Sequence, residues 1–287
     1  MSKKPFFQGR HITRRSTGDD SSIEYCESSY SLSKQEFLQE YIRNHSTAMA
    51  TGETYTFVDC HGGLGNWRDR VTNQYCNGSP VIFYRTLQAM GLPYRGLVFE
   101  KDEDRYAQLQ SNLYYEQEHV TCYNEDNCNT PDRVREIAHE QQRTRFGDPT
   151  LNWEEPYMYG TIYYDYTGWP KVSEISCVSE SSSLDLLLHF STSWWKALSE
   201  EKRLTRLDNQ VFQNLDELNR RYWYVSDPTR GTNNKFNFTF LHGSNTHNQS
   251  IHSHLVPVNT DEGQRRLIVA QYSKRRQQEI IQENQNV

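Results

Sequence analysis

Residues 57–65 read Phe-Val-Asp-Cys-His-Gly-Gly-Leu-Gly, and they continue a β-prone segment that begins at Tyr55. A strand that runs into an acidic residue and then into glycines is typical of a tight loop at which the backbone approaches a ligand. Glycine suits such a loop because it adopts positive φ and has no Cβ to keep the ligand away. The segment therefore predicts a site for a nucleotide-like cofactor; the alternative is a plain tight turn from strand to helix.

The composition indicates a folded, acidic chain. The 287 residues suffice for one large α/β domain or two small ones. Hydrophobic residues make up 35%, which is low, but the aromatic content of 13% is unlike that of disordered chains. The formal net charge of −6 argues against a generally basic protein that wraps nucleic acid.

The sequence also bears on localisation. No apolar run approaches the ~20 residues of a membrane span, and no apolar segment of a secretory signal follows the N-terminal lysines. The six cysteines include no Cys-x-x-Cys pair, which favours reduced thiols. We expect a cytoplasmic protein without a membrane partner.

Strands and helices are expected to alternate along the chain. The expected strands lie at about 55–59, 94–100, 119–123, 159–164, 185–190, 236–241 and 267–270. The expected helices lie at about 33–42, 79–90, 102–116, 132–142 and along an apolar stripe over 204–222, whereas 66–77 and 146–157 read as irregular. This alternation predicts an α/β fold with a Rossmann-like, doubly wound, mostly parallel seven-stranded sheet and helices on both faces. We expect one domain over residues 31–275, between a polar N-terminal tail over 1–30 and a C-terminal tail over 276–287.

Acidic residues follow two further expected strands. Glu100 ends the second one, where a carboxylate can accept both ribose hydroxyl protons. An acid-rich helix N-terminus explains Glu100 equally well. Asp126 follows the third strand and is a candidate for an exocyclic amine of adenine, although Asn124, Glu125 and Asn127 compete for that role. The alternative for Asp126 is a solvated loop.

The fourth expected strand ends in an aromatic segment. Residues 163–170 read Tyr-Tyr-Asp-Tyr-Thr-Gly-Trp-Pro. They lie where doubly wound folds place their substrate crevice, at the carboxyl end of a parallel strand. Asp165 can orient or deprotonate an amine or hydroxyl, and the neighbouring aromatic side chains can stack on a planar substrate. The alternative is an aromatic-lined turn that Asp165 caps.

An ordered set of segments resembles the three-Cys-motif partner protein family, which belongs to the Rossmann-like S-adenosylmethionine-dependent methyltransferases. The segments that carry the resemblance are 57–65, 78–80, 97–102, 164–168, 185–192 and 236–245. The resemblance covers roughly residues 33–275. It implies the fold of that superfamily and S-adenosylmethionine as cofactor.

The resemblance also implies roles for single residues. Asp59, Gly63 and Gly65 would contact the methionine part of the cofactor, and His61, which replaces the usual aromatic residue of that loop, joins them as a candidate. Glu100 would hold the ribose, and Asp126 would hold the adenine.

On the acceptor side, Asp165 would face the methyl acceptor. Tyr166 stands where the family has proline, and this departure affects the turn that shapes the acceptor pocket. The expected function is that of an S-adenosylmethionine-dependent methyltransferase with a nucleic-acid base as the leading acceptor. The alternative is a non-catalytic cofactor-binding or adaptor module that acts with a partner protein or nucleic acid.

Two other groups of residues have competing interpretations. Four histidines crowd one segment, namely His242, His247, His252 and His254. Their spacing lacks the i, i+4 helical pair of a zinc enzyme, so we expect a polar loop and no metal. Residues 220–224, Arg-Arg-Tyr-Trp-Tyr, can pack their aromatic side chains inward from a helix end and leave the charges solvated, or they can grip nucleic acid. We expect the packing.

Overall fold

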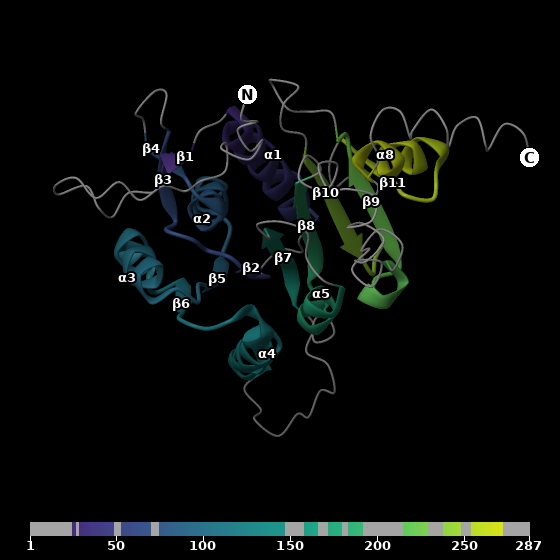
Figure 1. Cartoon of the computed structure of the whole chain (residues 1–287). Helices are drawn as coiled ribbons and strands as arrows, with labels where there is room; N and C mark the ends of the chain where they lie inside the picture. The colour runs from purple at the N-terminus through teal and green to yellow at the C-terminus, as the bar shows by residue number, and fades with distance from the viewer. Residues whose placement is uncertain are drawn as a thin grey trace, which may run out of the picture.

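The computed structural model describes residues 25–26, 29–48, 53–69, 75–146, 158–165, 172–179, 183–191, 215–228, 238–247 and 254–271 (Figure 1). The α-helices are α1 (Ser29–Ser46), α2 (Ser79–Ala89), α3 (Glu103–Asn112), α4 (Thr130–Phe146), α5 (Val172–Ser179) and α8 (Asp261–Gln271). Short 3-10 turns lie at Tyr114–Glu116 (η2), Asn127–Asn129 (η3) and Leu215–Leu218 (η5). Among the described residues, no helix is long and apolar enough to cross a membrane.

The large sheet has eight strands, not the expected seven, in the order β11-β9-β10-β8-β7-β2-β5-β6. Five of them run parallel to one another: β2 (Tyr55–Asp59), β5 (Tyr94–Phe99), β6 (Val120–Tyr123), β7 (Tyr159–Asp165) and β8 (Asp185–Ser191). The antiparallel pairs involve β9 (Tyr222–Ser226), β10 (Phe238–Ser244) and β11 (Leu255–Pro257). The expected α/β fold with a mostly parallel sheet is therefore confirmed. Six of the seven expected strands are present, and the sequence missed two strands of this sheet, β9 and β11.

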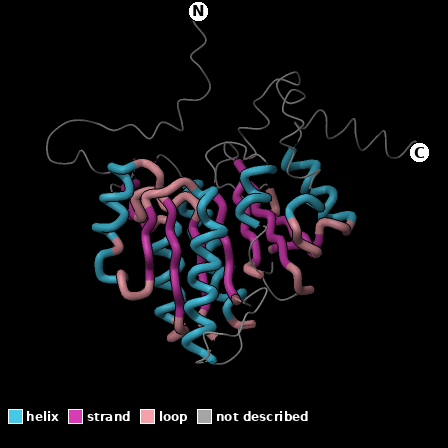
Figure 2. Tube along the Cα trace, turned by 90° about the horizontal axis from the view of Figure 1, so that it is seen from below, coloured by secondary structure: helices cyan, strands magenta, loops and turns pink. Residues whose placement is uncertain are grey.

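Helices cover both faces of this sheet (Figure 2). Helices α1, α2 and α3 contribute to one hydrophobic core, which includes Phe37, Phe83 and Leu109. Helices α4, α5 and α8 contribute to the other core, on the opposite face. Strand β8 serves both cores because it is apolar on both sides: Leu186 and Leu188 point to one, and Leu187 points to the other. Such two-sided burial is what a central parallel strand requires.

Sequence periodicity failed in three places. Residues 66–77, expected to be irregular, form the hairpin strands β3 (Asn66–Asp69) and β4 (Tyr75–Asn77), which make a small sheet with β1 (Tyr25–Cys26). Residues 267–270 lie in α8 and are not a strand. Tyr222, assigned to a long helical stripe, begins strand β9. For residues 267–270 and for Tyr222, a short apolar run fitted the helical period and the strand period equally well. Tertiary pairing decided which structure formed.

Most of the stripe over 204–222 and the expected loop over 146–157 lie outside the described residues, as do most of the two expected tails.

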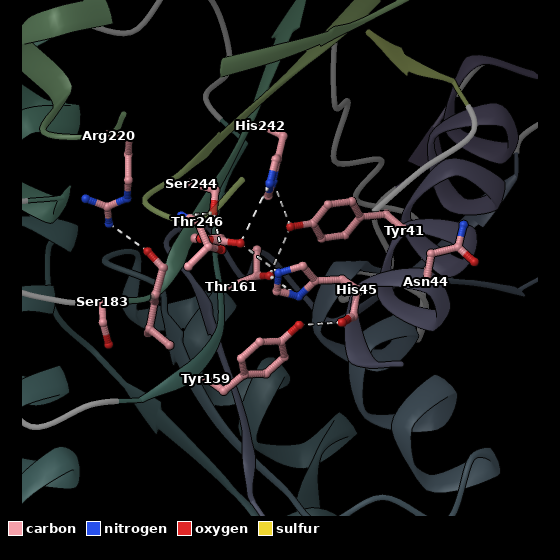
Figure 3. Close-up of polar contacts among 12 residues, drawn as sticks. Tyr41, Asn44, His45, Tyr159, Thr161, Ser183, Arg220, His242, Ser244 and Thr246 are labelled. Atoms are coloured by element: carbon pink, nitrogen blue, oxygen red, sulfur yellow. Dashed lines mark hydrogen bonds and ion pairs between the residues drawn. The ribbon is translucent and has the colours of Figure 1, made fainter. Parts of the chain in front are cut away.

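Helix α1 is anchored to the amino edge of the parallel strands by buried polar groups (Figure 3). His45 bridges the Tyr55 hydroxyl, 2.7 Å from Nδ1, and the Asp185 carboxylate, 2.9 Å from Nε2. His242 reaches the same carboxylate from β10, with its Nε2 3.7 Å from Oδ2, and its Nδ1 lies 3.0 Å from the Tyr41 hydroxyl. Two imidazoles therefore flank one carboxylate in a site where polar groups must find partners.

The carboxyl-edge half of α1 packs through apolar contact. The Phe37 ring stacks on Phe240 of β10 with 4.0 Å between the ring centroids. Tyr41 is fully buried one helical turn further along. The helix thus lies across β10, β8 and β7 and brings its first described turns to the carboxyl edge of the sheet.

Gly160 is a position at which β2 and β7 tolerate no side chain. Its φ is +147°, and a Cβ there would lie 1.7 Å from the carbonyl oxygen of Thr56. We expect Gly160→Ala to lower the free energy of unfolding by about 3 kcal/mol or more, because both the strand pairing and the backbone must distort. Urea unfolding measures the change.

Gly91→Ala is the matched control. Gly91 also has a positive φ, +67°, but none of the described residues lies within 4 Å of its would-be Cβ, so the expected cost is only about 1 kcal/mol. Equal losses in the two variants would contradict the steric explanation.

Candidate functional site

The glycine loop after β2 folds back on itself beside the end of β5. The Gly62 amide donates to the Phe99 carbonyl (2.8 Å), and the Gly65 amide donates to the Gly62 carbonyl (3.2 Å). The Gly78 amide, just before α2, then donates to the Gly65 carbonyl (2.6 Å). Strand end, hairpin and helix start are thereby joined around the loop.

Gly63 and Gly65 both have positive φ, +57° and +75°. They differ in their surroundings. A Cβ on Gly65 would meet Leu109 at 3.1 Å, so Gly65 is needed for packing as well as for the turn. A Cβ on Gly63 would have none of the described residues within 4 Å, so the described part of the chain leaves open space beside the backbone at Gly63. Open space beside a bare backbone is what a loop that receives a ligand requires.

Asp59 is the buried acid of the site. It is fully buried at the end of β2, and its Oδ1 accepts the His61 amide at 3.0 Å. Its other oxygen, Oδ2, has no hydrogen-bond partner of normal geometry among the described residues. Burial raises the pKa of Asp59 to about 6, against the lowering effects of the Ser79 hydroxyl and the His61 amide. An ionised carboxylate at this strand end therefore lowers the stability of the folded protein.

His61 connects the loop to its neighbours. Its Nε2 lies 3.2 Å from the Asn127 amide nitrogen, and its ring stands edge-on to Tyr164 with 4.7 Å between the centroids. Burial lowers the pKa of His61 to about 4, even though Asp165 and Asp126 act in the opposite direction. The imidazole is neutral at neutral pH, so it orders the loop without adding charge.

Glu100 and Asp126 lie at the ends of the next two strands. Glu100 directly follows β5 and is buried, and its Oε1 accepts the Asp102 amide at 2.9 Å. Asp102, in turn, caps α3 by accepting the Arg105 amide. Asp126 is exposed and caps η3 through the Cys128 amide (3.2 Å). Both acids therefore accept backbone amides at the start of the next element and have a local structural role. Their expected contacts with ribose and adenine stay predictions.

Asp165 is held by two cationic or polar partners. Lys34 of α1 makes a close ion pair with Oδ2, and His189 of β8 places its Nδ1 2.6 Å from Oδ1. Burial alone would raise the pKa of Asp165, but Lys34 and His189 outweigh it and hold the pKa well below the usual range. Such a carboxylate stays ionised and is a weak base. Tyr166 lies outside the described residues.

The structure brings the described candidates to one edge of the sheet. β7, β2, β5 and β6 are neighbours in that order, and their carboxyl ends carry Asp165, Asp59, Glu100 and Asp126. Glu100 and Asp126 lie just beyond β5 and β6, whereas Asp59 and Asp165 are the last residues of their strands. This edge is where ligands bind in open α/β sheets.

Sequence reasoning missed two side chains of this edge, Lys34 and His189. Lys34 is 131 residues from Asp165 in the sequence. Nothing in the local sequence marks it as more than one charge on an amphipathic helix. His189 sits inside the apolar run of β8, where a polar residue between leucines and phenylalanine was the available signal.

The clustered histidines do not form a metal site among the described residues. His242 is fully buried in β10, His247 stacks edge-on against Tyr222, and His254 lies 3.7 Å from Glu40. His252 lies outside the described residues. The predicted polar loop is therefore wrong for His242, which belongs to the buried network under α1.

The segment over 220–224 packs inward in part. Arg220 is buried and donates to the carbonyls of Ser179 (3.1 Å) and Leu184 (2.7 Å). Trp223 and Tyr224 are also buried, whereas Tyr222 is exposed. The expected inward packing of the aromatic side chains holds for Trp223 and Tyr224, whereas Arg220, expected to be solvated, is buried. The segment belongs to a loop and a strand and not to a helix end.

No family model matches the sequence, and no curated protein matches it. Solved structures of similar fold are mostly methyltransferases. A protein from Legionella pneumophila is 11% identical over 75% of this chain and 86% of its own, with a TM-score of 0.48. An rRNA methylase from Streptococcus thermophilus is 12% identical over 74% of this chain and 94% of its own (TM-score 0.36).

A geranyl diphosphate methyltransferase, solved with geranyl diphosphate and sinefungin, is 10% identical over 75% of this chain and 78% of its own (TM-score 0.41). At such low identity the likeness concerns the path of the chain and transfers no residue of the site.

The raised pKa of Asp59 predicts a pH-dependent cost in stability. Its folded pKa of about 6 lies above the ordinary 3.8, so the folded state binds the proton more tightly than the unfolded state. Wild-type stability should therefore fall as pH rises through this window. Asp59→Asn cannot ionise and should gain about 2–3 kcal/mol relative to wild type between pH 4 and pH 7. Urea unfolding across this pH range measures the difference.

Asp132→Asn serves as the control because Asp132 is exposed on α4 and pairs only with Arg135 among the contacts of the described residues. A difference between Asp59→Asn and wild type that stays constant with pH would contradict the prediction.

Proposed function

We propose that this protein binds S-adenosylmethionine at the carboxyl edge of β2 and β5 and transfers its methyl group to an acceptor beside Asp165. The observation that carries the proposal is the pairing of Gly63, beside whose backbone the described residues leave open space, with Asp59, a buried carboxylate whose Oδ2 has no hydrogen-bond partner of normal geometry among the described residues. A buried carboxylate oxygen without such a partner is costly, and a ligand amino group would satisfy it.

The residues present fit a nucleoside cofactor that carries an amino acid. Asp59 would hold the amino group, and the backbone of the loop at Gly63 and Gly65 would lie against the methionine part. Glu100 would accept from the ribose hydroxyls and Asp126 from the adenine, with neutral His61 ordering the loop between them. When bound, the cofactor supplies an activated methyl group on a sulfonium.

The chemistry would require little more from the protein than alignment of donor and acceptor in a site with limited water. Asp165 would orient the acceptor and balance positive charge near it. Its lowered pKa makes removal of a proton by Asp165 unfavourable, which narrows the two roles that the sequence left open. A nucleic-acid base remains the leading acceptor, and Tyr166 is the candidate stacking residue beside Asp165. Membership in the three-Cys-motif partner protein family is also part of this proposal.

One observation favours a second function, that of a non-catalytic cofactor-binding module. Each Asp165 oxygen already has a partner, Lys34 on one side and His189 on the other. An acid engaged in this way would serve structure equally well. In this case the protein would bind the cofactor and act as an adaptor for a partner protein or nucleic acid in the cytoplasm.

Cofactor binding is the first test. We expect wild type to bind S-adenosylmethionine and S-adenosylhomocysteine in the micromolar range by titration calorimetry. Gly63→Val should abolish binding because its side chain would fill the open space and strain a backbone with φ of +57°. Asp59→Ala should weaken binding by removing the acid.

Gly91→Val is the matched control, since Gly91 has a similar φ and, among the described residues, similarly open surroundings, and it lies after α2, away from the loop that contains Gly63. It should bind like wild type. Absence of binding by folded wild type would refute both functions, catalytic and non-catalytic.

Methyl transfer is the second test. Wild type and Asp165→Asn are incubated with labelled S-adenosylmethionine and pools of DNA, RNA and protein. We expect label in one pool, reduced at least about tenfold by the substitution, which is the size of effect lost with one orienting interaction. Binding without transfer to any pool would favour the adaptor function, and transfer unaffected by Asp165→Asn would remove Asp165 from the mechanism.

A further inference from the structure

Lys34 lies at the carboxyl edge as a built-in cation. Its ammonium pairs with Asp165 at the end of β7, and its charge also stabilises the ionised form of Asp59 at the end of neighbouring β2. The Lys34 side chain is only 21% exposed, and its helix is fixed by the packing of Phe37 and by the His45 network. The cation is therefore held in place and does not swing freely from the surface.

The charge balance at these two strand ends is simple. Asp59 and Asp165 supply two negative charges when both are ionised, and Lys34 supplies one positive charge. Removal of the Lys34 charge therefore makes this group more negative by one unit, whatever the protonation state of His189. The difference acts in a partly buried setting, where charges interact more strongly than at a solvated surface.

We infer that Lys34 is the internal counter-ion of this site and that it sets how strongly the site prefers a cationic ligand to a neutral ligand of the same shape. The inference rests on the proposed function. S-adenosylmethionine carries a sulfonium, whereas S-adenosylhomocysteine carries a neutral thioether at the same place, so the two ligands differ by one positive charge and one methyl group.

Lys34 disfavours that added charge because it repels the sulfonium and neutralises a carboxylate that would attract it. The resident cation lowers the affinity for the charged donor relative to the neutral product. It thereby makes loss of the sulfonium charge more favourable within the site. The residues around the glycine loop in the sequence do not predict this cation, because it comes from α1.

The test compares the ratio of the two dissociation constants, for S-adenosylhomocysteine and S-adenosylmethionine, in wild type and in Lys34→Gln. Glutamine removes the charge and retains a donor for Asp165. We expect the ratio to shift toward S-adenosylmethionine by roughly tenfold at low ionic strength, and by less in high salt. Titration calorimetry measures both constants without any acceptor.

Two further variants separate charge from structure. Lys34→Arg keeps the charge and should keep the wild-type ratio. Arg43→Gln removes one positive charge from an exposed position on the same helix and should also keep it. Thermal unfolding verifies that each variant is folded, and Lys34→Met replaces Lys34→Gln if the latter fails to fold.

The outcomes are distinguishable. If wild type binds both ligands and removal of the Lys34 charge leaves the ratio unchanged, the counter-ion inference is overturned and the proposed function stands. A shift that appears equally in Arg43→Gln overturns the inference too, because a general field would then account for it. If wild type binds neither ligand, the proposed function fails, and the inference fails with it.

Discussion

Helix α1 is held across the large sheet by polar contacts at both ends, and the site depends on this double attachment. Near its C-terminal end, His45 joins the partly buried carboxylate of Asp185, and Lys34, nearer its beginning, joins Asp165. Stacking of Phe37 on Phe240 supports the span between them. A partly buried carboxylate that loses its partner loses stabilisation that water replaces only in part, so each attachment penalises displacement of the helix. The position of the Lys34 cation at the carboxyl edge therefore depends in part on the contact between His45 and Asp185 at the opposite edge.

The two acids at the carboxyl edge have opposite electrostatic environments. Burial dominates at Asp59 and raises its pKa to about 6, whereas the partners of Asp165 outweigh burial and lower its pKa. The difference arises because Asp165 faces α1 and β8, which supply Lys34 and His189, while the Ser79 hydroxyl and the His61 amide only partly offset the burial of Asp59. The Asp165 carboxylate is thus stabilised by charged or polar side chains within the protein, and the Asp59 carboxylate is stabilised less.

Much of the parallel core could be predicted from the sequence because its signals are local. Strand β2, the acid at its end and the glycines after it occupy consecutive residues, and helix α2 begins at Ser79, where the sequence placed the start of its expected helix. Gly63 and Gly65 of the loop after β2 were identified for the property that the structure gives them, positive φ.

The rest could not be predicted because it depends on distant partners. Strand β9 and helix α8 have short apolar runs that fit either period, and their states follow from pairing with β10 and from packing on the sheet. Lys34 and His189 reach Asp165 from other elements, and no spacing rule connects them. Tyr41 and His242 likewise meet only because α1 crosses β10.

Strand β11 has a consequence for how this protein behaves at high concentration. It is an outer strand of the large sheet, and an outer strand with free amides can recruit a strand from another molecule. β11 is only three residues long and ends in Pro257, which has no amide hydrogen to donate. The next residue, Val258, turns its amide back to the Trp223 carbonyl (2.8 Å). Strand β11, one of the two strands that the sequence did not predict, thus leaves a blunt border, poorly suited to edge-to-edge aggregation.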